Sequence, residues 1–182
     1  MMNNERYTKD DAYILLNRIE QWINNCDTKT SVLLGLLGIF FGLNTSIFEV
    51  FDFIKCFILY PNNFCFIDKV FIFVALFFVI VYITMIILCL FFSIKSINAK
   101  IYNIYKNKLF FGNIATSYES AEKYHKDITK MTQKKLQFDI NEQIYINSKI
   151  CTKKFKNYKK ALVFLILSIL TSIVCSILIT FL

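Results

Sequence analysis

The sequence predicts an all-α membrane protein: three transmembrane helices with helical cytosolic extensions that form a small bundle. Two observations predict this fold class. Of the 182 residues, 56% are hydrophobic, but only 4 are Gly and 1 is Pro, too few to form the turns of a β-sandwich or barrel. The formal charge of +8 is also segregated from the apolar residues along the chain.

Residues 1–30 are expected to form a cytosolic amphipathic helix. Thr8 can cap it, and Asp10 and Asp11 lie in the first turn, where the helix dipole favours acidic groups. Apolar residues then recur at helical spacing: Ala12, Leu15, Leu16, Ile19, Trp22 and Ile23. The segment carries charges throughout and has no apolar core of a cleavable signal peptide. We therefore expect the first spanning helix to stay in the protein.

Three later runs contain no charged residue, namely residues 31–48, 70–94 and 161–182. A helix of the shortest run spans roughly 27 Å, close to the thickness of a bilayer's hydrocarbon core. The alternative, three buried helices of a soluble protein, needs far more amphipathic partner sequence than the chain contains. We expect a transmembrane hairpin over residues 31–94, with an outer loop at 49–69, and a C-terminal transmembrane helix over 161–182.

The distribution of charge predicts the orientation. Residues 95–160 hold fifteen Lys and five acidic side chains, whereas residues 1–30 and 49–69 each carry a net charge of −1. Positive residues near membrane ends mark the cytoplasmic side. We therefore place the N-terminus and residues 95–160 in the cytoplasm of a multi-pass protein. The lysines also suit the anionic headgroups of a lipid bilayer.

The basic region 95–160 reads as helical. Residues 96–109 can prolong the second span into the cytosol, and Gly112 is expected to break that helix. The pattern Thr-Ser-Tyr-Glu at residues 116–119 is typical of a capping box for another helix. That helix continues into the third span, either in one piece or in two with a break near Met131. No Gly/Pro/Ser-rich linker separates the cytosolic and membrane layers.

Most catalytic chemistry is excluded by composition. His125 is the only histidine, and the four glycines match no phosphate-binding loop. The six cysteines lack the spacing of a zinc site. Cys56 and Cys65 share the outer loop and can pair if that side is oxidising. We expect no enzymatic activity, no metal site and no bound cofactor.

A glycine pattern in the first run is typical of close helix association. Gly38 and Gly42 form a G-x-x-x-G step, and Gly35 lies one turn earlier. The pattern fits a homo-oligomer, in which the glycines meet a second copy. It fits equally well packing against this chain's own second or third span.

Five polar or aromatic residues are candidates for binding a ligand. Asp27 and Lys29 lie where the first helix enters the bilayer, either as plain interface charges or as ligand groups. Trp22 is an interfacial anchor or a stacking surface. Asp139 and Gln143 share one helix face, which is either solvated or a hydrogen-bonding lining inside the bundle.

Several motifs together resemble a known family. The run W-I-N-N-C-D-T-K-T-S-V-L-L-G at residues 22–35 resembles the first membrane segment of the Pycsar transmembrane effectors, the PycTM family. Three later runs resemble that family's cytosolic segment and its entry into the last span: F-F-G-N-I at 110–114, D-I-N-E-Q-I at 139–144 and S-K-I-C-T-K-K-F at 148–155. The resemblance covers nearly the whole chain after about residue 10.

The resemblance implies a role in bacterial anti-phage defence. A functionally linked nucleotide cyclase makes a cyclic pyrimidine mononucleotide, cCMP or cUMP, during infection. The effector senses this activating ligand and impairs the inner membrane in an abortive infection. For the present chain this implies a bacterial inner-membrane protein with a ligand site formed by Trp22, Asp27, Lys29, Asp139 and Gln143.

Two other functions fit parts of the sequence. One is a constitutive membrane scaffold or toxin-like pore subunit regulated by a protein partner, in which Asp139→Ala and Gln143→Ala leave activity intact. The other is nucleic-acid binding by the basic region. No nucleic-acid-binding fold signature accompanies these lysines, so we expect no nucleic-acid partner.

Overall fold

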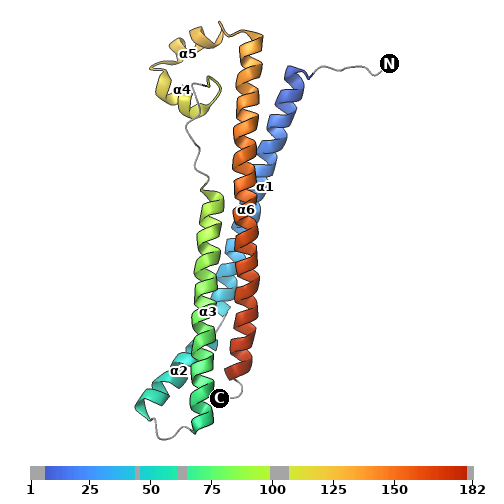
Figure 1. The fold of residues 1–182 in the computed structure, drawn as a ribbon. Coiled ribbons are helices and arrows are strands. Elements are labelled where there is room, and N and C mark those ends of the chain that lie inside the picture. The colour runs from blue at the N-terminus through green and yellow to red at the C-terminus, as the bar shows by residue number, and fades with distance from the viewer. Residues whose placement is uncertain (1–6, 44–45, 61–64, 99–106, 180–182) are drawn as a thin grey trace, which may run out of the picture. The chain divides into compact units, whose positions relative to one another are not determined.

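The computed structural model describes residues 7–43, 46–60, 65–98 and 107–179. In these ranges the regular structure is entirely helical, which confirms the all-α prediction (Figure 1). The helices are α1 (Lys9–Leu43), α2 (Ser46–Leu59), α3 (Phe66–Ile97), α4 (Phe111–Ser117), α5 (Ala121–Ile128) and α6 (Gln133–Ile179).

The chain divides into two compact units that share α1 and α6. Unit 1 comprises Met1–Asp27 and Asn98–Phe155, and unit 2 comprises Thr28–Ile97 and Lys156–Leu182. These boundaries lie within five residues of the ones that the charge distribution marks at 30, 94 and 160. The three uncharged runs therefore fall in unit 2, and most of the basic region falls in unit 1.

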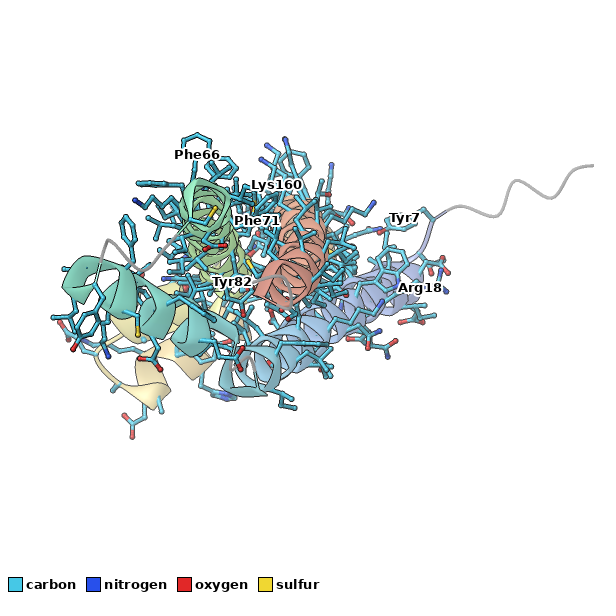
Figure 2. The ribbon with its side chains drawn as sticks, turned by 90° about the horizontal axis from the view of Figure 1, so that it is seen from below. Tyr7, Arg18, Phe66, Phe71, Tyr82 and Lys160 are labelled. Carbon is cyan, nitrogen blue, oxygen red and sulfur yellow. The ribbon has the colours of Figure 1, made fainter. Side chains whose placement is uncertain are left out.

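Unit 2 is held together by a narrow apolar seam between long helices. The C-terminal part of α6 lies beside α3 (Figure 1), and the buried cluster between the helices contains Leu33, Leu37, Tyr82, Ile86, Cys89, Ala161 and Leu165. The Phe92 and Phe164 rings stack with centroids 5.5 Å apart. The Lys160 ammonium, labelled in Figure 2, lies 5.0 Å from the Phe92 centroid. Lys160 thus covers the end of the seam with a charge.

The outer surface of unit 2 is apolar as well. Tyr82 is 3% exposed between the helices, whereas Phe66 at the start of α3 is 78% exposed and points away from them (Figure 2). Many other large apolar side chains of α3 are exposed, including Phe73, Phe77 and Ile80. Among the described residues, two helices, Phe66–Ile97 and Gln133–Leu178, are long and apolar enough to cross a membrane.

The predicted first span has a less simple structure. Residues 31–43 end α1, residues 46–48 begin α2, and residues 44–45 lie outside the described ranges. This span therefore stays a prediction.

The segment predicted as an outer loop, residues 49–69, contains helical structure. Residues 49–59 belong to α2, because this stretch is rich in apolar residues that bury one face. Val50 packs with Ala75, Val79 and Cys175. Cys56 and Cys65 are both exposed free thiols.

The glycine positions on α1 face open space. A Cβ atom built on Gly35, Gly38 or Gly42 meets no other atom within 4 Å. The described parts of this chain's own α3 and α6 therefore do not pack against these glycines. Of the two interpretations of the G-x-x-x-G step, the structure disfavours packing within the chain.

Three details of the basic region differ from the predicted elements. The helix expected over residues 96–109 ends with α3 at Ile97; residues 99–106 lie outside the described ranges, and residues 107–109 form a turn. Gly112 lies inside α4 instead of breaking a helix. It accommodates the Phe110 ring, which comes within 2.7 Å of the position that a Cβ would occupy.

The capping box predicted at residues 116–119 is also displaced. Residues 116 and 117 end α4, and Ser120 caps α5 by accepting a hydrogen bond from the Lys123 backbone N–H at 3.3 Å. Residues 129–132 separate α5 from α6, so the region 117–160 contains two helices. As predicted, α6 continues without interruption into the third apolar run.

Candidate functional site

An apolar contact between the first parts of α1 and α6 forms the base of unit 1. Ala12 and Leu16 of α1 are buried with Ile140 of α6. The start of α1 is fixed by Thr8, whose Oγ1 accepts from the Asp11 N–H at 3.2 Å, while Asp11 Oδ2 accepts from the Thr8 N–H at 2.8 Å. This reciprocal pair confirms the predicted helix start.

The turn before α4 is attached to α6 by one buried asparagine. Asn107 is fully buried, and its Nδ2 donates to the Asp139 carbonyl at 2.8 Å and to Glu142 Oε2 at 3.1 Å. Its Oδ1 accepts from the Leu109 N–H at 2.9 Å, and its carbonyl accepts from Asn113 Nδ2 at 3.2 Å. All the polar groups of this side chain are satisfied, as burial requires.

Asp139 completes this attachment from α6. Its side chain is fully buried, its Oδ2 accepts from the Lys108 N–H at 3.4 Å, and its Oδ1 forms an ion pair with Lys135 Nζ at 2.8 Å. The sequence left open whether this helix face is solvated or forms a hydrogen-bonding lining inside the bundle. At Asp139 it is a buried lining. Its partners show that it fixes the 107–109 turn.

A cavity of about 350 Å³ opens beside this turn. It lies within unit 1 and is lined by Asn107, Lys108, Asn113, Ser117, Tyr118 and Asp127. The lining therefore combines one cation, one carboxylate, two amides, a hydroxyl and a phenol. In composition it suits a small polar molecule with several hydrogen-bonding groups.

Asp127 is the electrostatic centre of the lining. Its Oδ2 lies 2.5 Å from Lys108 Nζ and accepts from the Tyr118 hydroxyl at 2.5 Å. The hydrogen bonds from Lys108 and Tyr118 lower the pKa of Asp127. The same carboxylate raises the pKa of Tyr118 to about 12, because the phenol donates its proton to it. At neutral pH the lining holds a carboxylate, an ammonium and a neutral phenol.

Two tyrosine rings form one side of the cluster. The Tyr118 and Tyr124 centroids are 5.2 Å apart at an interplanar angle of 71°, an edge-to-face pair. The Tyr124 hydroxyl also donates to the Lys108 carbonyl at 3.4 Å. Through these contacts α5 holds the Lys108 segment in place.

The candidate residues from the start of the chain lie elsewhere. Asp27 is partly exposed and forms an ion pair with Lys154 of α6 at 2.5 Å, and the Lys154 side chain is only 7% exposed. Trp22 is 50% exposed on α1. Lys29 is exposed and belongs to unit 2.

The five sequence-predicted site residues do not meet at one place. Asp139 and Lys154, the partner of Asp27, are fifteen residues apart on α6, which corresponds to roughly 22 Å along the helix axis. This separation exceeds the length of a mononucleotide. Gln143, one turn after Asp139, is half-buried. The structure thus separates an Asp27–Lys154 pair from a cluster around Asp139.

Sequence reasoning did not single out the residues that line the cavity as ligand-binding groups, because they are separated along the chain. Lys108 and Asp127 are nineteen residues apart and meet only because α4 and α5 fold back on the turn at residues 107–109. Asn107 gave no helical or capping pattern that would have singled it out. The one local signal was the Asn-containing stretch K-N-K-L-F-F-G-N, which suits a turn.

The chain matches the Pycsar effector protein domain, PycTM, over residues 11–182. It belongs to the PycTM family. A Pycsar effector protein, GmPycTM from Gulbenkiania mobilis, is 29% identical to the chain, and the alignment covers 93% of this chain and 92% of the relative. No solved structure matches the chain significantly. The resemblance found in the sequence is therefore confirmed.

Membership of the PycTM family assigns the chain to the membrane effectors of Pycsar anti-phage defence. The two apolar helices of span length agree with a membrane protein. In this PycTM chain the cavity is built by residues 107–127, which lie inside the matched range.

Proposed function

We propose that this effector senses a cyclic pyrimidine nucleotide, cCMP or cUMP, through unit 1 and responds by impairing the inner membrane, which ends the infection with the cell. A nucleotide cyclase supplies the ligand. The observation that carries the proposal is the polar cavity of unit 1, with its ammonium and phenol, in a chain whose unit 2 exposes apolar side chains. A cyclic mononucleotide is a small anion with a flat base, which such a lining suits.

The connection between sensing and response rests on two helices. Both α1 and α6 contribute residues to each unit without interruption. A change in the packing of α6 in unit 1 therefore reaches the apolar part of the same helix. Bistable packing of this kind converts a local ligand contact into a larger rearrangement.

The response itself requires more than one copy in this proposal. Three membrane-spanning segments in one chain are too few to enclose a pore, and the exposed glycines of α1 give a second copy a place to pack. We propose a homo-oligomer in the inner membrane, with the N-terminus and residues 95–160 on the cytoplasmic side.

Leakage from liposomes tests the proposal. The purified full-length chain is reconstituted into dye-loaded vesicles, and cCMP, cUMP, cAMP or buffer is added on the side that unit 1 faces. We expect dye release with cCMP or cUMP and little with cAMP or buffer. Protein that is helical by circular dichroism but releases no dye with either pyrimidine nucleotide contradicts the proposal. Release without any ligand favours the constitutive pore subunit instead.

A further inference from the structure

The geometry points to a defined ligand site in the cavity of unit 1. We propose that it binds a 3′,5′-cyclic nucleotide with Lys108 on the phosphate and Asp127 on the ribose 2′-hydroxyl. This inference rests on the proposed function and adds to it the place and the groups that recognise the ligand. The residues concerned lie between α4, α5 and the turn that precedes them.

The positions of the two charges match the chemistry of the ligand. In a 3′,5′-cyclic nucleotide, the 2′-hydroxyl is bonded to the carbon next to the one that carries the cyclic phosphate. The ligand thus presents an anion beside a hydrogen-bond donor. Lys108 Nζ and Asp127 Oδ2, 2.5 Å apart, present a cation beside an acceptor. Charge-assisted hydrogen bonds of this kind are the stronger ones in proteins.

Both charged groups are accessible to a ligand. The Lys108 side chain is 30% exposed and that of Asp127 is 42% exposed. Asn107, by contrast, is fully buried and its hydrogen-bonding groups are used within the protein. Asn107 therefore shapes the cavity wall, while Lys108 and Asp127 are free to exchange partners.

The remaining lining groups suit a base. Tyr118 offers a ring for stacking, which is tolerant of the base's identity. The Ser117 hydroxyl can both donate to and accept from a base edge. The cavity of about 350 Å³ is of a size for a single small ligand.

Binding of this ligand changes the partners of the Lys108–Asp127 ion pair. A phosphate on Lys108 competes with Asp127 for the same ammonium, and the 2′-hydroxyl then compensates Asp127. The backbone N–H of Lys108 contacts the Asp139 carboxylate of α6 at 3.4 Å. A change in the partner of the Lys108 side chain can therefore reach α6 through a single hydrogen bond from the Lys108 backbone. This helix extends to Ile179.

Calorimetric titration of the full-length chain in lipid nanodiscs tests the site. The ligands are cCMP and cUMP together with their 2′-deoxy counterparts. We expect Lys108→Gln to raise the Kd of every ligand about tenfold, which corresponds to about 1.4 kcal/mol. Lys108→Arg, which keeps the charge, should restore most of the affinity.

The role of Asp127 is isolated by comparing the Kd of each ribonucleotide with the Kd of its 2′-deoxy counterpart. The unmodified chain should bind the ribonucleotide about tenfold more tightly than the 2′-deoxy ligand. Asp127→Ala should remove this preference and bring the two Kd values together. The matched control is Lys123→Gln with Glu119→Gln, an exposed ion pair in the same region whose loss should change neither Kd nor ratio.

The outcomes separate the site from the function. If the unmodified chain binds a ribonucleotide but Lys108→Gln leaves its Kd unchanged, the site is wrong and the proposed function stands. A ribose preference that persists in Asp127→Ala also overturns the assignment. If the unmodified chain binds neither pyrimidine nucleotide, the proposed function fails and the site with it.

Discussion

Asp127 shows how a single residue sets the state of the cavity in unit 1. It accepts from Lys108 and Tyr118, and both contacts stabilise its charged form, so its pKa is lowered. A lowered carboxyl pKa gives a contribution to stability that is present above the ordinary value near 4 and is lost as the pH falls through the folded-state pKa. At neutral pH the pair is intact, so a ligand meets an ionised carboxylate.

Tyr118 provides the matching test at high pH. Its pKa is raised to about 12, mainly by its hydrogen bond to Asp127, because that bond stabilises the neutral phenol. The sign is opposite to that of Asp127: the contribution to stability is fully present below the ordinary value near 10 and is lost as the pH rises through about 12. An ultraviolet titration of tyrosinate should show a component near pH 12 that disappears in Tyr118→Phe.

The control for this titration removes the carboxylate and keeps the phenol. In Asp127→Asn the pKa of Tyr118 should fall towards its ordinary value, because the charged acceptor is gone. A component near pH 12 that stays the same in both variants contradicts the Tyr118–Asp127 hydrogen bond.

For Asp139, the sequence predicted the position on a helix face but not the burial of the side chain. Spacing placed Asp139 and Gln143 on one helix face, which the continuous α6 confirms. Spacing did not decide whether that face is solvated, because the deciding partner, Asn107, is 32 residues away and reaches the Asp139 carbonyl through a turn. Burial of a polar side chain depends on such long-range partners, which no local pattern in one sequence contains.

At the scale of elements, the start of a helix was predictable where a capping side chain bonds the backbone of its own first turn. Thr8 and Asp11 exchange hydrogen bonds, as the sequence predicts. The Thr-Ser-Tyr-Glu pattern at residues 116–119 has the same form, but Thr116 instead donates to the Gly112 carbonyl inside α4. Ser120 is the cap of α5, and Tyr118, the extended residue after α4, donates to Asp127. Tertiary contact overrode a local signal there.

The cap at Thr8 gives a prediction for α1. Thr8→Ala removes the acceptor for the Asp11 N–H and should lower the free energy of unfolding by about 1 kcal/mol. Hydrogen exchange of the full-length chain in detergent should show faster exchange in the first turn of α1. Thr8→Ser, which keeps the hydroxyl, is the control. Equal protection in all three proteins contradicts the cap.

The Asp27–Lys154 ion pair gives a prediction for the contact between α1 and α6 in unit 1. Lys154 is nearly buried, so Asp27→Ala leaves an ammonium without its carboxylate, which costs more than losing both charges. We expect Asp27→Ala to lower the midpoint of thermal unfolding more than Asp27→Ala combined with Lys154→Met.

A double-mutant cycle on circular dichroism melts measures this coupling. Asp10→Ala is the control, because Asp10 is an exposed acidic residue of the same helix. If the combined variant melts lower than Asp27→Ala alone, Lys154 contributes through its packing and not through the pair.

The whole molecule joins a polar unit to an apolar unit through α1 and α6, and the partition was visible in the sequence because charge and hydropathy are segregated. The fold class and the long helices followed from that segregation. The arrangement of α2, α4 and α5 did not, since these short helices depend on contacts such as Val50 with Ala75 and Tyr118 with Asp127. Single-sequence periodicity determines long helices better than short ones.

Substitution of the exposed glycines of α1 tests whether copies of the whole molecule assemble through this face. A Cβ at Gly38 or Gly42 meets nothing within 4 Å, so the described part of a single chain leaves room for a side chain to begin at these positions. The test variant is Gly38→Leu with Gly42→Leu. In protein that stays helical by circular dichroism, we interpret a loss of function in this variant as lost packing between copies, because the glycines allow helix backbones to approach closely. We expect cross-linking in liposomes and ligand-induced dye release to fall about tenfold, while the Kd for the nucleotide is unchanged.

Ile39→Leu, an exposed position between the two glycines, is the matched control and should release dye normally. Full release by the glycine variant shows that copies assemble through another surface.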